Sequence, residues 1–301
     1  MDDFASTALL KLVATELRRQ GVVIEIPTEF DGKTSSGSKA NALALGIEQV
    51  GPKGVLAIGQ GYTRVRFHPV IAVLLRSTSP QDFVQRWLRL EAFYHGNHRV
   101  LLKGPVQANQ HSLTLEHASM KGAPPSVGED LLIAGFLAAL MSGAGTLDLE
   151  LSIDGNVVIR GNDMTGPTSI PDKSHLWHFS WSGFAPRLRT NFTPTEGEPV
   201  SASLASVLLN DMARGWQIAD AAAVMGMSSR TVQRRLSAEN TTFQKILRKV
   251  RAEAAAKFIL DENLSLSETG YVSGYADQAH FNREFKRRFN LTPAEFAKVS
   301  S

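Results

Sequence analysis

The chain has 301 residues, of which 43% are hydrophobic and 20% are charged, with a formal net charge of +3 and no cysteine. This apolar content is typical of a folded globular protein and excludes a disordered chain. The lack of cysteine excludes disulfides, thiolate metal sites and cysteine nucleophiles within these residues, and it favours a reducing compartment.

The positive charge is concentrated near the C-terminal end. Residues 214–301 carry 14 Lys and Arg against 9 Asp and Glu, whereas the preceding 213 residues carry 18 against 20. This asymmetry favours a nucleic-acid-binding module that follows a neutral or acidic one. The N-terminal end lacks the basic region of a signal peptide, and the longest apolar run, 131–141, is about half of what spans a bilayer. We therefore expect a soluble, cytoplasmic protein with no membrane association.

The predicted elements of the first part mix helices and strands. Apolar periodicity predicts helices over residues 6–20, 80–94 and 129–141, with further apolar segments at 51–61 and 69–76. The polar, Gly- and Ser-rich segment 31–38 predicts a loop. Alternating stretches predict strands over 99–102, 112–116, 147–153 and 157–160, the last two joined as a hairpin at Asp154, Gly155 and Asn156. The pattern indicates an α+β domain that ends near residues 160–190.

Segment 162–199 is rich in Pro, Gly, Thr and Ser, yet it also carries the large aromatic residues Trp177, Phe179, Trp181 and Phe184. We expect these aromatics to pack the segment onto one of the domains. A pocket lined by Trp177 and Trp181 is the alternative, although aromatic side chains are more often simply packed. A helix is predicted over 201–213, and the sequence is almost wholly helical from there to the end.

Two segments near the C-terminus, 218–236 and 265–289, share one plan. Each predicts a short helix, a turn at Gly226 or Gly274, and a second, amphipathic helix. Ser265 and Glu268 have the spacing of a capping box. The packed faces of the second helices would consist of Val232 and Leu236 in the first unit and of Phe281, Phe285 and Phe289 in the other. The opposite faces are polar and basic, which is what a helix needs to read a major groove.

A helix of about 18 residues, 243–260, is predicted between these two units. Its inward stripe consists of Phe243, Ile246, Leu247, Val250, Ala254 and Phe258. At 1.5 Å per residue this helix spans roughly 27 Å. It can therefore hold two recognition helices about one DNA turn apart, on the order of 34 Å. We expect both units to read the same face of a duplex.

This C-terminal part resembles the DNA-binding domain of AraC/XylS-family transcription regulators. The resemblance covers residues 217–297 and is carried by segment 226–236, by Gly274-Tyr275, and by segment 281–289 with Thr292, Pro293 and Phe296. Through Gly59-Gln60-Gly61-Tyr62 and Ser79-Pro80, the first part is more loosely similar to the arabinose-binding-like sensor domain of a subgroup. The domains predicted are a ligand-sensing or dimerisation domain over 1–190, a linker and connecting helix over 191–213, and a DNA-binding domain over 214–301.

The resemblance implies which side chains contact DNA. Base-edge contacts are expected from Arg230, Gln233 and Arg234 in the first unit and from Gln278, Asn282 and Arg283 in the second. Phosphate contacts are expected from Ser228, Thr231, Lys286 and Arg287, while Arg235 and Arg288 would contact phosphates or lie in solvent. Ser229 and Ala279 complete the predicted interface. Thr269, Gly270 and Ser273 depart from the family's larger aliphatics or alanine, so we expect the second unit to be less rigid.

Other chemistry has less support. His95 and His98, like His175 and His178, have a spacing that can ligate a metal from one helix face, but no carboxylate cluster accompanies them, so we predict no metal and no cofactor. We find no Ser/His/Asp or paired-carboxylate arrangement, and an enzyme is not predicted. The expected partners are double-stranded promoter DNA, a small-molecule effector, RNA polymerase and a second copy of the chain. The function predicted is that of a sequence-specific DNA-binding transcription regulator, with activation or repression left open. An enzyme or repair protein fused to a DNA-binding domain, and an architectural DNA binder, are the alternatives.

Overall fold

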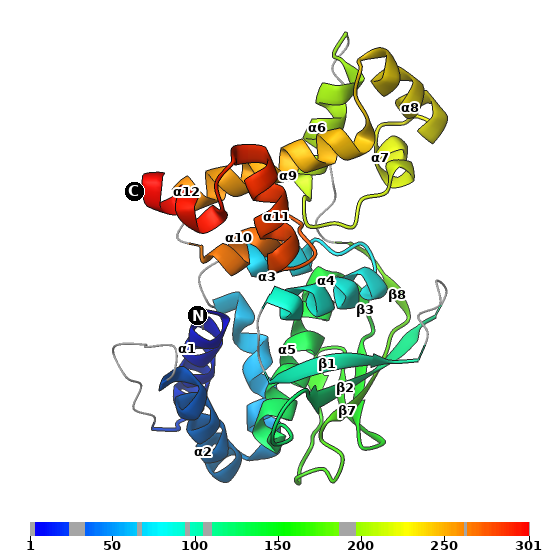
Figure 1. Cartoon of the computed structure of the whole chain (residues 1–301). Helices are drawn as coiled ribbons and strands as arrows, with labels where there is room; N and C mark the ends of the chain where they lie inside the picture. The colour runs from blue at the N-terminus through cyan, green and yellow to red at the C-terminus, as the bar shows by residue number, and fades with distance from the viewer. Residues whose placement is uncertain are drawn as a thin grey trace. The chain divides into compact units, whose positions relative to one another are not determined.

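The computed structural model describes residues 4–23, 34–64, 68–93, 97–104, 110–186, 197–261 and 264–300. Its contacts divide the chain into two compact units, Met1–Arg187 and Leu188–Ser301. The first unit combines helices with a sheet, and every regular element described in the second is a helix (Figure 1). The predicted fold class, an α+β domain followed by an all-α domain, is confirmed.

The helices of the first unit mostly lie where the periodicity placed them. In chain order they are α1 (Phe4–Arg19), α2 (Thr34–Ala57), the 3-10 helix η1 (Ile58–Arg64), α3 (Pro69–Leu75), α4 (Pro80–Phe93) and α5 (Val127–Ala144). The loop predicted over 31–38 is wrong where the structure describes it, because residues 34–38 already belong to α2; residues 31–33 lie outside the described part. Serine and threonine favour helix starts as well as loops, which explains the error.

Helix α5 is the central helix of this unit. A Cβ on Gly135 would come within 2.0 Å of the Leu56 carbonyl oxygen, and one on Gly59 within 2.3 Å of the Gly135 carbonyl carbon. The backbones therefore touch where α2 and η1 cross α5, which only glycine permits. By length and composition α5 could also cross a membrane, but 61% of it is buried inside the protein. That burial is typical of a core helix.

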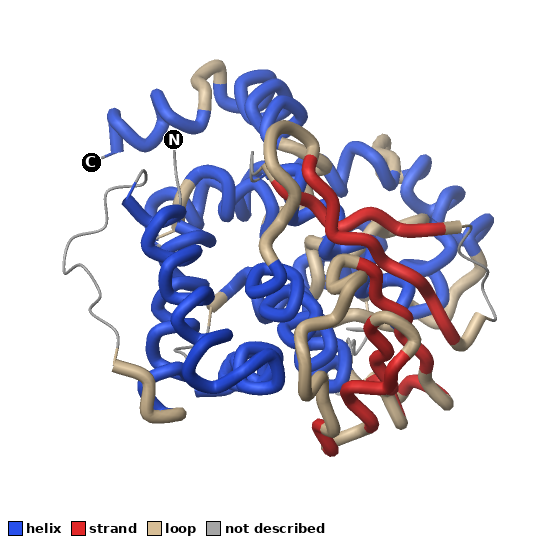
Figure 2. Tube along the Cα trace, turned by 90° about the horizontal axis from the view of Figure 1, so that it is seen from below, coloured by secondary structure: helices blue, strands red, loops and turns tan. Residues whose placement is uncertain are grey.

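The strands form one antiparallel sheet in the order β1-β2-β7-β4-β5-β6, and Figure 2 shows them as one layer. The strands are β1 (His98–Lys103), β2 (Ser112–Ser119), β4 (Glu150–Ile153), β5 (Asn156–Arg160), β6 (Asp163–Met164) and β7 (Leu176–Ser180). A separate ribbon pairs β3 (Thr146–Leu147) with β8 (Gly183–Phe184). The predicted hairpin at 154–156 is present between β4 and β5.

Strand β7 comes from the aromatic-rich segment 162–199 and lies between β2 and β4. Trp177 and Phe179 alternate along it and are fully buried, while Leu176 and His178 face outward. The Trp177 indole N–H donates a hydrogen bond to the Ser174 carbonyl oxygen at 2.7 Å. The described residues of this segment up to 186 therefore pack on the first unit, as expected, and they supply a central strand of that unit's sheet.

The edge strand β1 is covered by a carboxylate from α4. Glu91 accepts hydrogen bonds from the Val100 backbone N–H at 2.9 Å and from the Trp87 indole N–H at 2.8 Å. This occupies a backbone donor that an added strand would otherwise use. Burial raises the pKa of Glu91 to about 7, although both hydrogen bonds act to lower it.

This raised pKa predicts a pH-dependent stability. Because the folded state holds the Glu91 proton more tightly than the unfolded chain, the contribution of Glu91 is fully present below about pH 4.5 and is lost as the pH rises through about 7. The free energy of unfolding of wild type minus that of Glu91→Gln should therefore fall between pH 5 and 7.5, as measured by urea denaturation. Glu129→Gln is the control, because Lys39 and the Ser126 backbone N–H lower the pKa of Glu129 despite its burial. Its difference from wild type should stay constant between pH 5 and 7.5 and should change only below about pH 4.5. A difference for Glu91→Gln that is constant with pH would contradict the assignment.

Candidate nucleic-acid interface

The second unit contains two helix-turn-helix pairs that are built around one long helix. The first pair is α7 (Ile218–Val224) with α8 (Ser229–Ala238), and the second is α10 (Leu266–Val272) with α11 (Gln278–Phe289). Helix α9 (Phe243–Asp261) joins them, and α6 (Val200–Asn210) and α12 (Pro293–Ser300) pack against it. Figure 1 shows α8 and α11 towards opposite ends of α9. Both helix-turn-helix segments that the sequence predicts are therefore present.

The two turns end their first helices in the same way. Gly226 and Gly274 have positive φ angles of 67° and 83°. The next backbone N–H bonds back to the carbonyl five residues earlier, from Met227 to Ala222 at 2.9 Å and from Tyr275 to Gly270 at 3.1 Å. This is the Schellman arrangement, in which glycine takes the left-handed position.

Each recognition helix then begins at a capping side chain. The Ser228 hydroxyl accepts from the Thr231 backbone N–H at 3.1 Å, and the Asp277 carboxylate accepts from the His280 backbone N–H at 2.7 Å. The capping box predicted at Ser265 is also present. Ser228, predicted at a phosphate, thus also has a structural role at the start of α8.

The inward faces of the recognition helices are apolar, as predicted. Val232, Leu236, Phe281 and Phe285 are almost completely buried. Phe289 is only half-buried, but its ring lies 4.6 Å from that of Phe285. These contacts orient the opposite, polar face of each helix towards solvent.

Helix α9 has 19 residues, close to the predicted 18, and spans about 28 Å. The apolar residues predicted to face inward are buried from Phe243 to Val250. After Val250 the buried residues are Ala252 and Ala255, whereas Ala254, which the periodicity predicts to face inward, is half-exposed. The difference has a packing cause. The stripe assumed one apolar face, whereas α9 is covered by α6 along with α10, α11 and α12.

Helix α6 belongs to the core of this second unit. Val200, Leu204, Val207 and Leu208 pack with Trp216 and the first helix-turn-helix pair. Its first turn has no side-chain cap of its own. Instead Glu239, at the end of α8, accepts from the backbone N–H groups of Val200 and Ser201 at 2.9 and 3.0 Å. Sequence spacing could not reveal this contact, because the partners lie 39 and 38 residues apart.

The predicted DNA-contacting side chains lie mainly on the exposed faces of α8 and α11. Those exposed are Ser228, Arg230, Gln233, Arg234, Arg235, Ala279, Asn282, Arg283, Lys286 and Arg287, and those half-buried are Ser229, Thr231 and Gln278. In α11 the Gln278 amide donates to the Asn282 side-chain oxygen at 3.2 Å. Their roles at bases and phosphates stay predictions.

The departures from the family pattern in α10 are buried. Thr269 and Ser273 are fully buried, and neither hydroxyl has a hydrogen-bond partner in the described part of the chain. The buried Tyr275 hydroxyl likewise has no hydrogen-bond partner in the described part of the chain, and burial raises its pKa. A buried hydroxyl without a partner costs about 1–3 kcal/mol. These costs support the expectation that the second helix-turn-helix pair, α10 with α11, is less rigid than the first.

Thr269→Val should therefore stabilise the protein by about 1–2 kcal/mol, since it removes an unpartnered hydroxyl without changing shape or β-branching. The matched control is Thr231→Val in α8, where the hydroxyl lies 2.9 Å from that of Ser228 and should not be improved by removal. Thermal or urea unfolding measures both. A loss of stability in Thr269→Val would show that its hydroxyl is satisfied.

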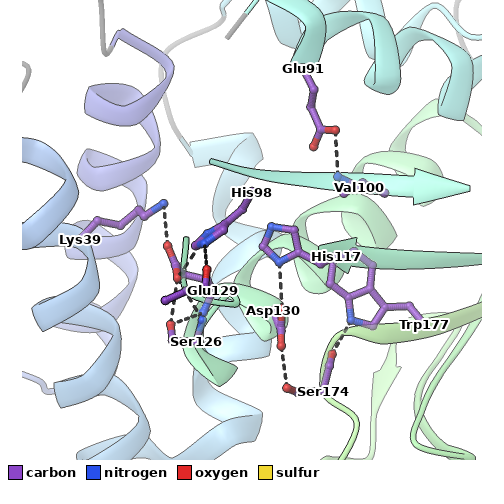
Figure 3. A network of polar contacts seen from close by, with 11 residues as sticks. Lys39, Glu91, His98, Val100, His117, Ser126, Glu129, Asp130, Ser174 and Trp177 are labelled. Atoms are coloured by element: carbon purple, nitrogen blue, oxygen red, sulfur yellow. Dashed lines mark hydrogen bonds and ion pairs between the residues drawn. The ribbon is translucent and has the colours of Figure 1, made fainter. Parts of the chain in front are cut away.

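The first unit holds a buried polar cluster around Asp130, drawn in Figure 3. Its carboxylate lies 2.9 Å from the His117 ring Nδ1 and accepts from the Ser174 hydroxyl at 2.6 Å. His117 also stacks on Trp177, with ring centroids 5.6 Å apart. In a nucleophilic triad the imidazole stands between hydroxyl and carboxylate, whereas here the carboxylate stands in the middle. The geometry therefore supports a structural role.

The histidine pairs do not have the geometry that their spacing suggested. His178 lies in strand β7, where residues three apart point to opposite faces, and its ring bonds to the Thr114 hydroxyl at 3.1 Å. His98 lies in strand β1, and His95 lies outside the described residues. Among the residues described, no group of three His, Asp or Glu side chains is arranged to hold a metal ion.

Comparison with known proteins matches residues 221–298 to a helix-turn-helix domain family. Over 81 residues the chain is 37% identical to the transcriptional activator NphR of a Rhodococcus species, covering 27% of this chain and 24% of that protein. Over 90 residues it is 32% identical to the HTH-type transcriptional activator CsvR of Escherichia coli, covering 30% and 34%. The chain spans about a quarter to a third of the length of these curated relatives.

Among solved structures, the transcriptional regulator CdpR of Pseudomonas aeruginosa has a TM-score of 0.33 and 15% identity, over 97% of this chain and 98% of that one. A Chromobacterium violaceum regulator with an AraC-type DNA-binding domain has a TM-score of 0.32 and 21% identity, over 34% and 93%. The domain family and the curated relatives bear out the resemblance of the C-terminal part to AraC/XylS-type regulators. Residues 221–298 match a helix-turn-helix domain family and are similar to part of these transcriptional activators.

Proposed function

We propose that this protein is a sequence-specific transcription regulator that reads two adjacent major-groove segments of promoter DNA. The observation that carries the proposal is the pair of capped recognition helices, α8 and α11, whose Arg-, Gln- and Asn-bearing faces are exposed. Helix α8 shares a hydrophobic core with α9, and α11 packs against α9. Arginine and amide side chains make bidentate contacts to guanine and adenine edges. The names of the relatives further support the role of an activator of transcription. A contact with RNA polymerase is part of the proposal for such an activator.

The first unit is the proposed control element. A compact α+β unit suits the binding of a small-molecule effector or of a second copy of the chain. An effector would change transcription only if it bound one arrangement of the protein better than another. We propose a cytoplasmic regulator without enzymatic activity, in keeping with relatives that are named as regulators.

Selection of bound duplexes from a random pool tests the proposal, repeated with and without cell metabolites. The expected outcome is two half-elements about 10 base pairs apart. If no common motif emerged in any selection, sequence-specific binding would be rejected. A motif that responds to metabolites would identify the class of effector.

Point variants test the recognition helices themselves. Arg234→Ala should lose about 1–3 kcal/mol of binding to the selected site and relax the preference at one base position. Lys286→Ala, expected at a phosphate, should instead weaken binding to selected and random duplexes alike. Titration with labelled duplexes measures both effects, with Lys257→Ala as a control for loss of exposed positive charge elsewhere on α9. If Arg234→Ala bound every duplex with the affinity of the wild-type protein, the proposed role of α8 would be refuted.

A further inference from the structure

A basic groove of about 410 Å³ runs between α9 and α11. Its cations are Lys245, Arg248 and Lys249 from α9 and Arg287 and Arg288 from α11. The one carboxylate among its lining residues is Glu284, which forms ion pairs with Arg287 and, at 3.8 Å, with Arg248. A second carboxylate, Glu253, pairs with Arg288 at 3.2 Å. The groove thus keeps a clear excess of positive charge.

The two lysines of the groove are the cations whose charge is not neutralised by a carboxylate in the described ranges. Lys245 and Lys249 are exposed and lie one helical turn apart on α9. In the described ranges neither ammonium group has an ion-pair or hydrogen-bond partner, whereas the three arginines of the groove all have one. An anionic ligand would therefore meet two unneutralised ammonium groups on the α9 wall.

The position of the groove on α11 indicates which anion it meets. At 3.6 residues per turn, Glu284 points roughly 100° away from Arg283 around the helix, and Arg287 points roughly 40° away from Arg283. Arg283 belongs to the face predicted to read bases, and Glu284 with Arg287 belongs to the flank beside α9. A major groove about 12 Å wide admits one helix and is bordered by a phosphate backbone on either side. A helix that reads bases with one face therefore brings phosphates to its flanks.

We propose that this groove binds the phosphate backbone of the duplex segment between the two half-elements, so that α9 contacts DNA as well as spacing the recognition helices. The inference rests on the proposed function. Charge complementarity supports it, and so does the continuity of the groove with α11 through Arg287, itself a predicted phosphate contact. An acidic protein segment is the competing occupant, and the experiment distinguishes the two.

The test compares two double variants of the full chain on the selected duplex and on a random duplex. In Lys245→Ala/Lys249→Ala the groove loses its free charges, and in Lys257→Ala/Lys298→Ala the same charge is removed from exposed positions outside the groove. Each phosphate contact adds about 0.9 to the slope of log affinity against log salt. Between 50 and 200 mM salt, wild type should therefore lose about 12-fold more affinity than the groove variant. The effect should be equal on both duplexes, while the control variant keeps the wild-type slope.

Two further measurements secure the interpretation. Lys245→Gln/Lys249→Gln keeps most of the side-chain length and should reproduce the shallower slope, with an unchanged melting temperature. Uncharged methylphosphonates placed between the half-elements should weaken wild type and leave the groove variant unaffected.

A wild-type salt slope in the groove variant would overturn the inference while Arg234→Ala still upheld the proposed function. Intact DNA binding with lost activation of transcription would also overturn it and would assign the groove to an acidic protein. Failure of wild type to bind any duplex would overturn both.

Discussion

Gly274→Ala is expected to unfold the second helix-turn-helix pair, whereas Gly226→Ala at the equivalent turn should be tolerated. Both glycines have positive φ, which costs a residue with a side chain about 1–2 kcal/mol. The two glycines differ in the space that a side chain would have. A Cβ on Gly274 would lie 2.0 Å from the Met212 carbonyl oxygen, while nothing lies within 4 Å of one on Gly226. Backbone cannot move aside as a flexible side chain can, so Gly274→Ala should cost more than about 4 kcal/mol.

Hydrogen exchange with mass spectrometry locates this effect. Peptides from 264–290 should lose protection in Gly274→Ala, whereas peptides from 218–238 should keep it. Binding to the selected duplex should fall with the second pair, since one recognition helix is lost. Similar costs for the two substitutions would show that the close approach to Met212 is relieved by a small shift, and that the left-handed backbone alone sets the penalty.

Asp130→Ala should destabilise the first unit by about 3–5 kcal/mol, because it removes the acceptor on which a buried cluster depends. Asp130 is 2% exposed, and its two oxygens serve the His117 ring and the Ser174 hydroxyl. Without the carboxylate both groups stay buried with an unmet hydrogen bond. Trp177, which stacks on His117 and bonds to Ser174, should lose its fixed position as well.

The neighbouring carboxylate provides the control. Glu129 is only partly buried, and it forms the capping box of α5 with Ser126 and an ion pair with Lys39 at 3.3 Å. Glu129→Ala should therefore cost only about 1 kcal/mol. Urea unfolding in a Trp216→Phe background makes tryptophan fluorescence report on the first unit alone, since the remaining tryptophans lie there. Equal costs at positions 129 and 130 would mean that water replaces the Asp130 contacts.

The second unit could be predicted in detail because its signals are local. A glycine that ends a helix, a capping residue and apolar residues four apart all act within about two turns, as at Gly226, Ser228, Val232 and Leu236. The exposed faces of α8 and α11 follow from the same periodicity. Their proposed base contacts rest on the resemblance to AraC/XylS regulators.

The first unit was harder to predict because its defining contacts join distant segments. The alternation of Trp177 and Phe179 indicates a strand, but the Pro- and Gly-rich surroundings of segment 162–199 hid it. Only the pairing of β7 with β2 and β4 makes that strand central. The pair of Gly59 and Gly135 likewise reads as two turn-formers or helix-weakeners until the crossing of η1 and α5 is seen.

The sequence by itself determined the two-part organisation, the all-α character of the second part and the capped recognition helices, since each depends on spacing along one stretch of chain. Tertiary structure alone decided which carboxylate meets which donor, as with Glu239 on α6 and Asp130 between His117 and Ser174. It also brought the cations of α9 and α11 into one groove. The physical reason is that periodicity specifies the face on which a side chain lies, whereas the partner of that face depends on how separate elements pack.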